Sequence, residues 1–383
     1  MRLRSLISAF AAVILTVPGL AQDQVQAQEQ PQASAQKTPP KGIVKLAKGV
    51  WGKLMAPDSR LDSMYVFQPA KGWDVAVSYR GHWNGIGMEI PIELHNQDGE
   101  VFGNPGVLRA SLVNRMSNHI GVNGGFGPLS IGYSFEVGKA NKTNRTISFN
   151  WLSTGYGIQL YYGRLNESAI SDIKFADDAV ITFPDTPTLI NTLRIDGYYA
   201  FNRKRFSYQA AFTGKMVQRK SAGSVIAGVK LHYCNIHMDD GSIKYMLVGT
   251  SDYTSYQFAL GAGYSYNIVA YHRDAASRKD LRSLRNITFN LTAVPLLTFL
   301  DKLSISGGKT SVMANGKMTP NFLARAGMAY TFGHWYLNAF ADFHYNYFNS
   351  TPCNIPIEDT FYCFNVNCRM FHLTASLQLH YRF

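Results

Sequence analysis

The sequence predicts an all-β fold: a transmembrane antiparallel up-and-down β-barrel of about twelve strands, with a short N-terminal amphipathic helix. Apolar and polar residues alternate along many segments, and no segment is apolar for long enough to span a bilayer as a helix. The chain is 46% hydrophobic and contains 22 Tyr and 23 Phe in 383 residues. Such a composition fits a secreted soluble protein or a barrel, and aromatic girdles at the membrane interfaces favour the barrel.

The clearest strand is residues 371–383, where polar and apolar residues alternate. A period of two places the apolar residues on one face of a strand. These residues are Phe371, Leu373, Ala375, Leu377, Leu379, Tyr381 and Phe383. The terminal Phe383, with Tyr381 two positions before it, resembles the C-terminal sorting signal of bacterial outer-membrane barrels. That resemblance implies an outer-membrane location and recognition of the last strand by the barrel assembly machinery.

Residues 1–21 are typical of a cleavable export signal. Arg2 and Arg4 supply the positive charge, an apolar stretch follows, and a small-residue cleavage site ends at Ala21. The apolar stretch is too short to span a bilayer as a helix, and Pro18 interrupts it. An uncleaved anchor is the alternative interpretation.

The rest of the chain divides into three predicted regions. Residues 22–40 are rich in Gln, Ala and Pro and lack an apolar face, which is typical of a disordered periplasmic leader. Residues 41–57 combine an apolar helical face with a basic remainder. They predict an amphipathic helix that lies on the membrane surface, caps the pore or packs against the barrel wall. Residues 58–383 form the predicted barrel.

Twelve segments of the barrel region alternate as spanning strands do. They are residues 72–95, 107–122, 127–138, 144–152, 155–164, 190–202, 222–234, 255–267, 285–298, 321–332, 335–348 and 371–383. The short links, expected as periplasmic turns, are 123–125, 153–155 and 333–334. The long links, expected as outer loops, are 165–189, 235–253, 300–319 and 349–367. An even strand number and this inequality of loop length are typical of bacterial barrels.

Two links on the periplasmic side, 203–221 and 268–284, are too long for turns. Either the strand count is wrong there, or these segments fold inward as a plug. A water-soluble antiparallel sandwich is the alternative for the whole pattern. It leaves the many outward aromatic residues at strand ends without an explanation.

The formal net charge is +12, from 37 Lys and Arg against 25 Asp and Glu. In an outer-membrane protein this excess favours phosphates of lipids and lipopolysaccharide, cell-wall polymers or an anionic solute as partners, and not nucleic acid. Solvated loop and lumen charge is the plainer alternative. The sequence indicates no cofactor, since it contains no P-loop, HExxH or GxSxG pattern.

The chain has four cysteines, three of them near the C-terminus. In an oxidising compartment the first choice for a disulfide is Cys353 with Cys363, because both fall in one predicted loop. The sequence does not fix the connectivity. Zinc is the weaker alternative because no CxxC pair is present, so no metal site is predicted.

Residues 198–228, YYAFNRKRFSYQAAFTGKMVQRKSAGSVIAG, resemble the signature segment of a Bacteroidetes outer-membrane family known as domain of unknown function 4421. LDSMYV at 61–66 and IGYSFEV at 131–137 resemble that family's opening and third-strand segments. The resemblance spans roughly residues 58–383, and only the central segment is specific. It implies a barrel in the outer membrane of that phylum, and it transfers no activity or catalytic residue.

Within the central segment, residues 203–221 carry basic and aromatic residues and no acid. The basic residues are Arg203, Lys204, Arg205, Lys215, Arg219 and Lys220. Three interpretations remain open: a plug that binds an anion in the lumen, a periplasmic contact to a cell-wall polymer, or a solvated basic turn.

Strand parity assigns a set of charged and histidine side chains to the lumen. They are Arg80, Arg109, Glu136, Arg194, Asp196, Lys230, His232, Arg325, Asp342, His344, His372 and Arg382. Cations outnumber acids, which predicts anion preference if the barrel conducts. A barrel of this size encloses less space than a porin, so a narrow or plugged channel is expected. A closed barrel stabilised by internal ion pairs is the alternative.

Asp342 and His344 are weak candidates for catalysis. A spacing of two places both on the lumen side of one strand, where a carboxylate can orient an imidazole as a general base. A polar lumen brings such pairs together by default, so no catalytic role is assigned. The sequence therefore favours a non-enzymatic outer-membrane barrel, either an anion-preferring channel or a structural barrel. A hydrolase that uses this luminal Asp–His pair is the alternative.

Overall fold

The structure, a computed structural model, describes most of the chain from Arg60 to Phe383. The described residues are 60–70, 72–95, 101–114, 116–138, 144–174, 180–238, 252–307, 310–350, 353–357, 360–364 and 366–383. The predicted export signal (1–21), leader (22–40) and amphipathic helix (41–57) lie outside them. Among the described residues no helix is long and apolar enough to cross a membrane.

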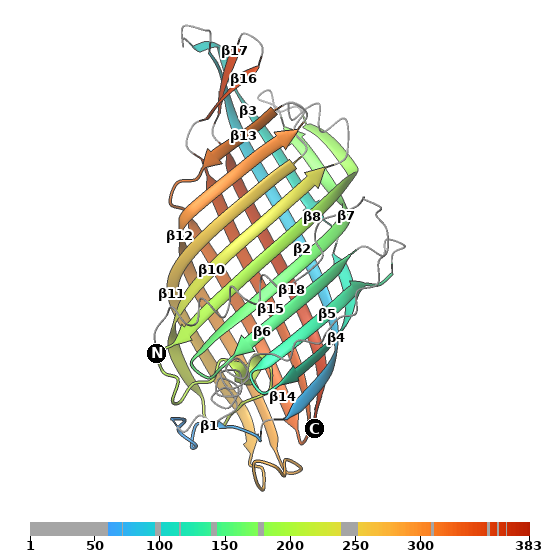
Figure 1. The fold of residues 1–383 in the computed structure, drawn as a ribbon, viewed down its shortest axis with the longest axis vertical. Helices are drawn as coiled ribbons and strands as arrows, with labels where there is room; N and C mark the ends of the chain where they lie inside the picture. Colours follow the sequence, from blue (N-terminus) through green and yellow to red (C-terminus); the bar gives the residue numbers. More distant parts are fainter. Residues whose placement is uncertain are drawn as a thin grey trace, which may run out of the picture. The chain divides into compact units, whose positions relative to one another are not determined.

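The described chain consists almost entirely of strands, with one short helix, α3 (Gln209–Phe212). The strands are β1 (Val66–Phe67), β2 (Trp73–His95), β3 (Val101–Asn114), β4 (Ser117–Phe126), β5 (Leu129–Glu136), β6 (Arg145–Leu152), β7 (Tyr156–Lys174), β8 (Val180–Ala200), β9 (Val217–Gln218), β10 (Ala222–Met238), β11 (Asp252–Arg273), β12 (Arg285–Gly307), β13 (Thr310–Asn315), β14 (Pro320–Phe332), β15 (Trp335–Asn349), β16 (Cys353–Ile357), β17 (Thr360–Phe364) and β18 (Asn367–Arg382). Figure 1 shows the long strands tilted around a common axis.

The long strands close into a barrel. Each wall strand pairs antiparallel with the next, in the order β2, β18, β15, β14, β12, β11, β10, β8, β7, β6, β5 and β4, and β4 pairs again with β2. Because β3 and β4 lie end to end along β2, they form one wall strand, and the wall has 12 strands as the sequence predicts. Among the described strands, closure pairs both edges of every wall strand, which is the condition for strands in hydrocarbon.

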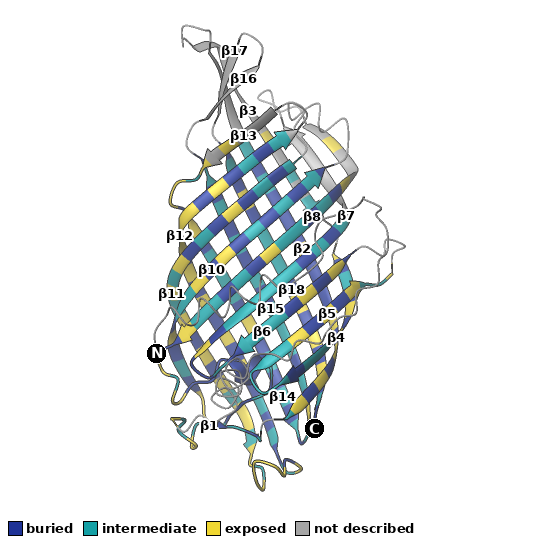
Figure 2. Cartoon of the chain, in the orientation of Figure 1, coloured by how far each residue is buried: buried dark blue, intermediate teal, exposed yellow. Residues whose placement is uncertain are grey.

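The faces of the wall follow the alternation in the sequence. On β18, Leu377 and Leu379 are 48% and 44% exposed, whereas Ser376 and Gln378 between them are buried. Figure 2 shows the same alternation of buried and exposed residues along the other strands. Apolar side chains therefore face outward, toward the position of lipid, and polar side chains face the lumen.

One extra residue between β3 and β4 reverses this alternation within their shared wall strand. Gly85 of β2 pairs with Val113, and Gly81 pairs with Asn118. The partner strand therefore advances one residue more than β2 does between these two pairs. Such a β-bulge moves every side chain beyond it to the opposite face.

The prediction that Arg109 lines the lumen is wrong for this reason. Arg109 lies directly opposite Glu89, which shares the outward parity of Val77 and Tyr79 on β2. The Arg109 and Glu89 side chains are 55% and 39% exposed, with 3.4 Å between nitrogen and oxygen. Both side chains thus lie on the outer face.

Two wall strands are short, and the wall narrows beyond them. β5 and β6 have 8 residues each, and past their ends β3 pairs directly with β7, from Asn114↔Ala169 to Arg109↔Lys174. Asn144 ends the β6 side of the ladder. Its side chain hydrogen-bonds both the N–H and the carbonyl of Asn166 on β7, and it donates to Glu136 at 2.6 Å.

Asn144→Ala is expected to destabilise the barrel by about 1 kcal/mol, because it removes the side-chain hydrogen bonds to the partly buried backbone groups of Asn166. Urea unfolding of the detergent-refolded protein measures the change. Asn150→Ala is the matched control, since the Asn150 amide makes only 3.4 Å contacts. Equal stability of the two variants would contradict the capping role of Asn144.

Several predicted loops are instead strand. Most of segment 165–189 belongs to β7 and β8, which pair out to Lys174↔Val180. Parts of 300–319 and 349–367 form β12, β13, β16 and β17. Polar residues in these segments break the alternation that is typical of membrane-spanning strands. The strands nevertheless continue to pair through backbone hydrogen bonds beyond the hydrocarbon region. One predicted turn also moves, from 123–125 to Gly127, whose φ is 55°.

Candidate functional site

The link from β8 to β10 enters the barrel. Residues 206–218, here called the plug, are buried throughout except for the half-buried Thr213 and Lys215. Helix α3 within the plug contacts β12, β14 and β15, and β9 at its end pairs with β1. Of the interpretations of 203–221, the structure shows the inward fold for this central part. The other long link shortens to 274–284, because β11 extends to Arg273.

Gln218 anchors the plug from inside. Its side-chain nitrogen lies 2.6 Å and 2.9 Å from the carbonyl oxygens of Arg205 and Lys220. Its side-chain oxygen accepts hydrogen bonds of 3.0 Å from the Ser207 N–H and from Asn267 Nδ2. One fully buried amide therefore joins both ends of the plug to the wall strand β11.

Further hydrogen bonds join the plug to the opposite wall. Arg325 Nη1 on β14 donates to the Tyr208 hydroxyl at 3.0 Å. Asn338 Nδ2 on β15 donates to the Phe212 carbonyl at 3.0 Å. Phe212 also packs against Gly327, where a Cβ would overlap its ring. The plug therefore fills this end of the barrel.

Among the basic residues of 203–221, all of which the structure describes, Lys215 alone reaches an acid inside the barrel. Its Nζ lies 3.1 Å from the Asp74 carboxylate. Burial lowers the pKa of Lys215, and the Asp74 charge opposes that shift. At the mouth, Arg219 pairs with Asp274 at 2.6 Å. The remaining basic residues also lie at the mouth: Arg203, Lys204, Arg205 and Lys220.

Two ion pairs lie next to the plug inside the lumen. Both carboxylate oxygens of Asp342 accept hydrogen bonds from the Arg325 guanidinium, and Arg194 Nε lies 2.8 Å from Asp196. The ring nitrogens of His344 have no hydrogen-bond partner. Asp342 and His344 share the lumen face of β15, but in this conformation the carboxylate orients an arginine and not the imidazole.

Four histidines form a connected group beyond these pairs. The ring centroid of His82 lies 4.9 Å from that of His119 and 5.7 Å from that of His372. His344 lies 6.4 Å from His372, and Tyr161 lies 5.8 Å from the same ring. His82 and His119 are not among the residues that the sequence assigns to the lumen. His82 belongs to the alternation Arg80, His82, Asn84, which glycines obscure. His119 has the same parity as Arg109, so the alternation that places Arg109 in the lumen also indicates His119.

Two luminal cations make their contacts to amides and not to acids. Arg80 Nη2 donates to Asn123 Oδ1 at 3.0 Å, and Lys230 Nζ donates to Asn346 Oδ1 across the lumen. Glu136 is half-buried and holds Asn144, and His232 is buried beside Lys230. Arg382 donates to the Gly214 carbonyl of the plug. The described lumen therefore has an excess of positive charge.

An apolar tier occupies the outer part of the lumen, where the sequence predicts polar residues. Its members are Ile86, Met88, Leu165, Ile190, Cys234, Ile236, Met238, Tyr253, Leu303, Ile305, Phe348, Val366, Cys368 and Met370. Along β10 the inward residues change from Lys230 and His232 to Cys234 and Ile236. The prediction of a polar lumen is thus wrong beyond the histidines, because the narrower wall leaves room for packed side chains only.

The cysteines give no metal site and no described disulfide. Cys234 and Cys368 are free and buried in the apolar tier. Cys353 pairs with Phe364 in the backbone register and Cys363 with Asn354, but both side chains lie outside the described residues. Their disulfide stays a prediction. Among the described residues no group of His, Cys, Asp and Glu has the arrangement of a metal site.

A small cavity lies within the described lumen. It has a volume of about 30 Å³ and lies between the plug and the wall, with Tyr208, Lys230, Asp196 and Arg325 in its lining. That volume matches about one water molecule. At this position the plug and the wall leave no room for a solute larger than water.

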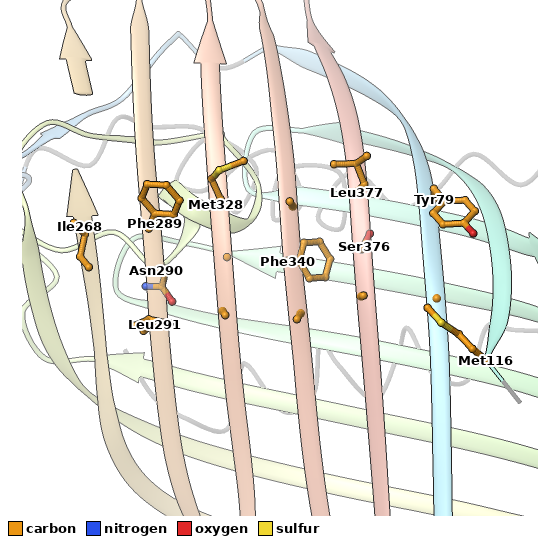
Figure 3. A pocket seen from close by; sticks show the side chains of 16 residues that line it. Tyr79, Met116, Ile268, Phe289, Asn290, Leu291, Met328, Phe340, Ser376 and Leu377 are labelled. Carbon is orange, nitrogen blue, oxygen red and sulfur yellow. The ribbon is translucent and has the colours of Figure 1, made fainter. Parts of the chain in front are cut away.

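A larger trough of about 690 Å³ lies on the outer face (Figure 3). Small residues stand directly opposite one another across β14, β15, β18 and β2: Ala326, Ala341, Ala375 and Gly81. Larger apolar side chains such as Phe289 and Leu377 surround them. Acyl chains of a bilayer would cover this face, so the trough indicates no particular function.

A family model described as Domain of unknown function (DUF4421) matches residues 108–368, more than half of the chain. The chain belongs to this family. The match agrees with the resemblance seen in residues 198–228. The DUF4421 description carries no activity, and no curated protein matches the sequence significantly.

Bacterial outer-membrane barrels are among the solved structures with detectable similarity. The outer membrane protease OmpT from Escherichia coli is 8% identical with a TM-score of 0.35, over 81% of this chain and 97% of that one. The translocator domain of autotransporter NalP from Neisseria meningitidis is 9% identical with a TM-score of 0.27, over 91% and 100%. The toluene transporter TodX from P. putida is 6% identical with a TM-score of 0.24, over 86% and 91%. At these TM-scores the likeness carries no argument about function.

Proposed function

We propose that this DUF4421 protein is a gated outer-membrane channel for small anions, closed by its plug in the conformation described here. The supporting observation is the pair Arg80 and Lys230, two buried luminal cations that contact amides and not acids. If the luminal charges only stabilised the fold, each would be expected to contact a group of opposite charge, because an uncompensated buried charge is costly. An excess of fixed positive charge along a pore favours anions.

Two barriers close the proposed path. The plug fills one end, and the apolar tier fills the other, with Phe348 and Met238 fully buried in it. Side chains also meet across the lumen, since Arg325 Nη1 lies 2.7 Å from Gln159 Oε1 on a distant wall strand. Opening of the channel therefore requires the plug to move and water to enter the apolar tier.

Conductance in planar bilayers tests the proposal. The opened variant replaces residues 207–216 with a short Gly-Ser linker and adds Phe348→Ser and Met238→Ser. We expect a closed wild-type protein and an opened variant whose reversal potential in a KCl gradient indicates chloride preference. Arg80→Gln and Lys230→Gln in the opened variant are expected to reduce that preference, whereas Lys302→Gln, at an exposed site, leaves it unchanged.

A folded opened variant that carries no current, or one that prefers cations, would refute the channel. Heat-modifiable migration on gels establishes folding. In the absence of current a structural barrel would remain. The hydrolase alternative requires Asp342 to leave Arg325 and turn to His344, a step that no contact among the described residues favours.

The proposed surroundings are outer-membrane lipids and lipopolysaccharide, in Bacteroidetes as the family resemblance implies. We also propose that the assembly machinery recognises β18. Phe383 is 69% exposed, and the Tyr381 ring lies 4.8 Å from Trp335 on the outer face. Membrane fractionation of a chain that lacks Phe383 tests this recognition. Undiminished insertion would contradict it.

A further inference from the structure

A layer of charged and histidine side chains lies between the plug and the apolar tier. Along β2 the inward residues run from Asp74 beside the plug, through Arg80 and His82, to Ile86 in the apolar tier. Strands β4, β8, β10, β14, β15 and β18 contribute to the same layer. Its buried cations are Arg80, Arg194, Lys230 and Arg325, and its buried acids are Asp196 and Asp342. In the described layer four buried cations stand against two buried acids, so positive charge is in excess.

The layer also presents buried nitrogen atoms without partners. Both ring nitrogens of His119 and of His344 lack a hydrogen bond, as do Arg80 Nε and His232 Nδ1. Buried polar groups are normally satisfied, so groups of this kind need an explanation such as an absent ligand. The ring centroid of His372 lies 5.7 Å from that of His82 and 6.4 Å from that of His344, so groups from three wall strands lie together in this layer.

We propose that this layer is a binding site for a small inorganic oxyanion of the phosphate and sulfate class. The inference deepens the proposed function and rests on it for the route by which the anion enters. A tetrahedral oxyanion accepts hydrogen bonds from several directions at once, which suits arginine, lysine and imidazole donors from separate walls. It would also neutralise the excess charge.

The plug limits access to this site. The cavity beside Lys230 and Arg325 has only about 30 Å³, and Tyr208 of the plug is part of its lining. An oxyanion is larger than the single water that such a space holds. Occupancy therefore requires Tyr208 to withdraw, and a barrel without the plug binds the anion more tightly than the wild-type barrel does.

Isothermal titration of the full-length detergent-refolded protein with inorganic phosphate, at constant ionic strength, tests the proposal. We expect saturable binding, tightened when a Gly-Ser linker replaces residues 207–216. Lys230→Met and Arg80→Gln are expected to weaken it by about 10-fold or more, the loss that follows from removing a charged hydrogen bond. Lys302→Met and Arg145→Gln, which remove exposed cations from other wall positions, serve as matched controls.

Equal phosphate affinity in all four point variants, or the same heat from chloride, would overturn the site. The phosphate group of a phosphorylated lipid is a second ligand with the same chemistry. The acyl chains of such a lipid would keep it out of the lumen. Competition by lipid A phosphate would therefore also contradict the proposal. Binding without any bilayer current would refute the channel and leave the site, whereas current without saturable binding would refute the site and leave the channel.

Discussion

Replacing Asp342 with Asn is expected to destabilise the folded barrel by about 3–5 kcal/mol, because it leaves the Arg325 guanidinium buried without its counter-charge. The two side chains are 5% and 10% exposed, so water cannot take over the role of the carboxylate. Urea unfolding in detergent or lipid vesicles, followed by tryptophan fluorescence, measures the loss.

The double variant Arg325→Met with Asp342→Leu is expected to recover most of that stability, since it removes both buried charges together. Asp252→Asn is the matched control, because Asp252 and its partner His237 are 36% and 38% exposed. A full loss in the control, or none in Asp342→Asn, would contradict the account of this ion pair. Loss of a hydrolytic activity in a stably folded Asp342 variant would instead support the enzyme hypothesis.

Gln218→Leu is expected to release the plug while the barrel stays folded. The substitution keeps the volume of the side chain but removes the partners of the Ser207 N–H and of the Arg205 and Lys220 carbonyls. The buried Ser207 N–H alone costs about 1–3 kcal/mol when it is unsatisfied. Lys215, only 11% exposed in the native plug, then becomes a site of tryptic cleavage.

Limited trypsin digestion with mass spectrometry reads out the cut after Lys215. The wild-type protein is expected to resist cleavage there. Gln257→Leu is the matched control, because Gln257 is equally buried but contacts Asp301 and Tyr347, away from the plug. Protection of Lys215 in the Gln218 variant, or cleavage in the control, would show that Gln218 is not the anchor.

The sequence predicts the wall well because each wall strand follows the same alternation of apolar and polar residues. Residues such as Leu377 and Ser376 differ so clearly in polarity that a period of two fixes their faces. The same rule fails at Arg109, because one extra residue before Ser117 reverses the parity and leaves no compositional trace. The alternation of polar and apolar residues does not reveal an inserted residue when the residues that follow it are plausible on either face of the strand.

The candidate site is less predictable from the sequence. Lys230, Arg325 and Asp342 are correctly assigned to the lumen by parity, but their partners are set by wall strands far apart in the chain. For a related reason, the sequence does not predict the apolar tier. On β10, Ile236 faces inward, where an outward position would be expected for an isoleucine in a barrel. Only the closed wall shows which residues meet inside it.

Hydrogen–deuterium exchange of the plug tests the central claim most directly. If residues 206–218 occupy the lumen of a closed barrel, their amides exchange as slowly as those of the wall strands β10 and β11 in the same sample. Exchange of the plug within seconds, while the wall strands stay protected, would contradict an occluded lumen and with it the proposed gate.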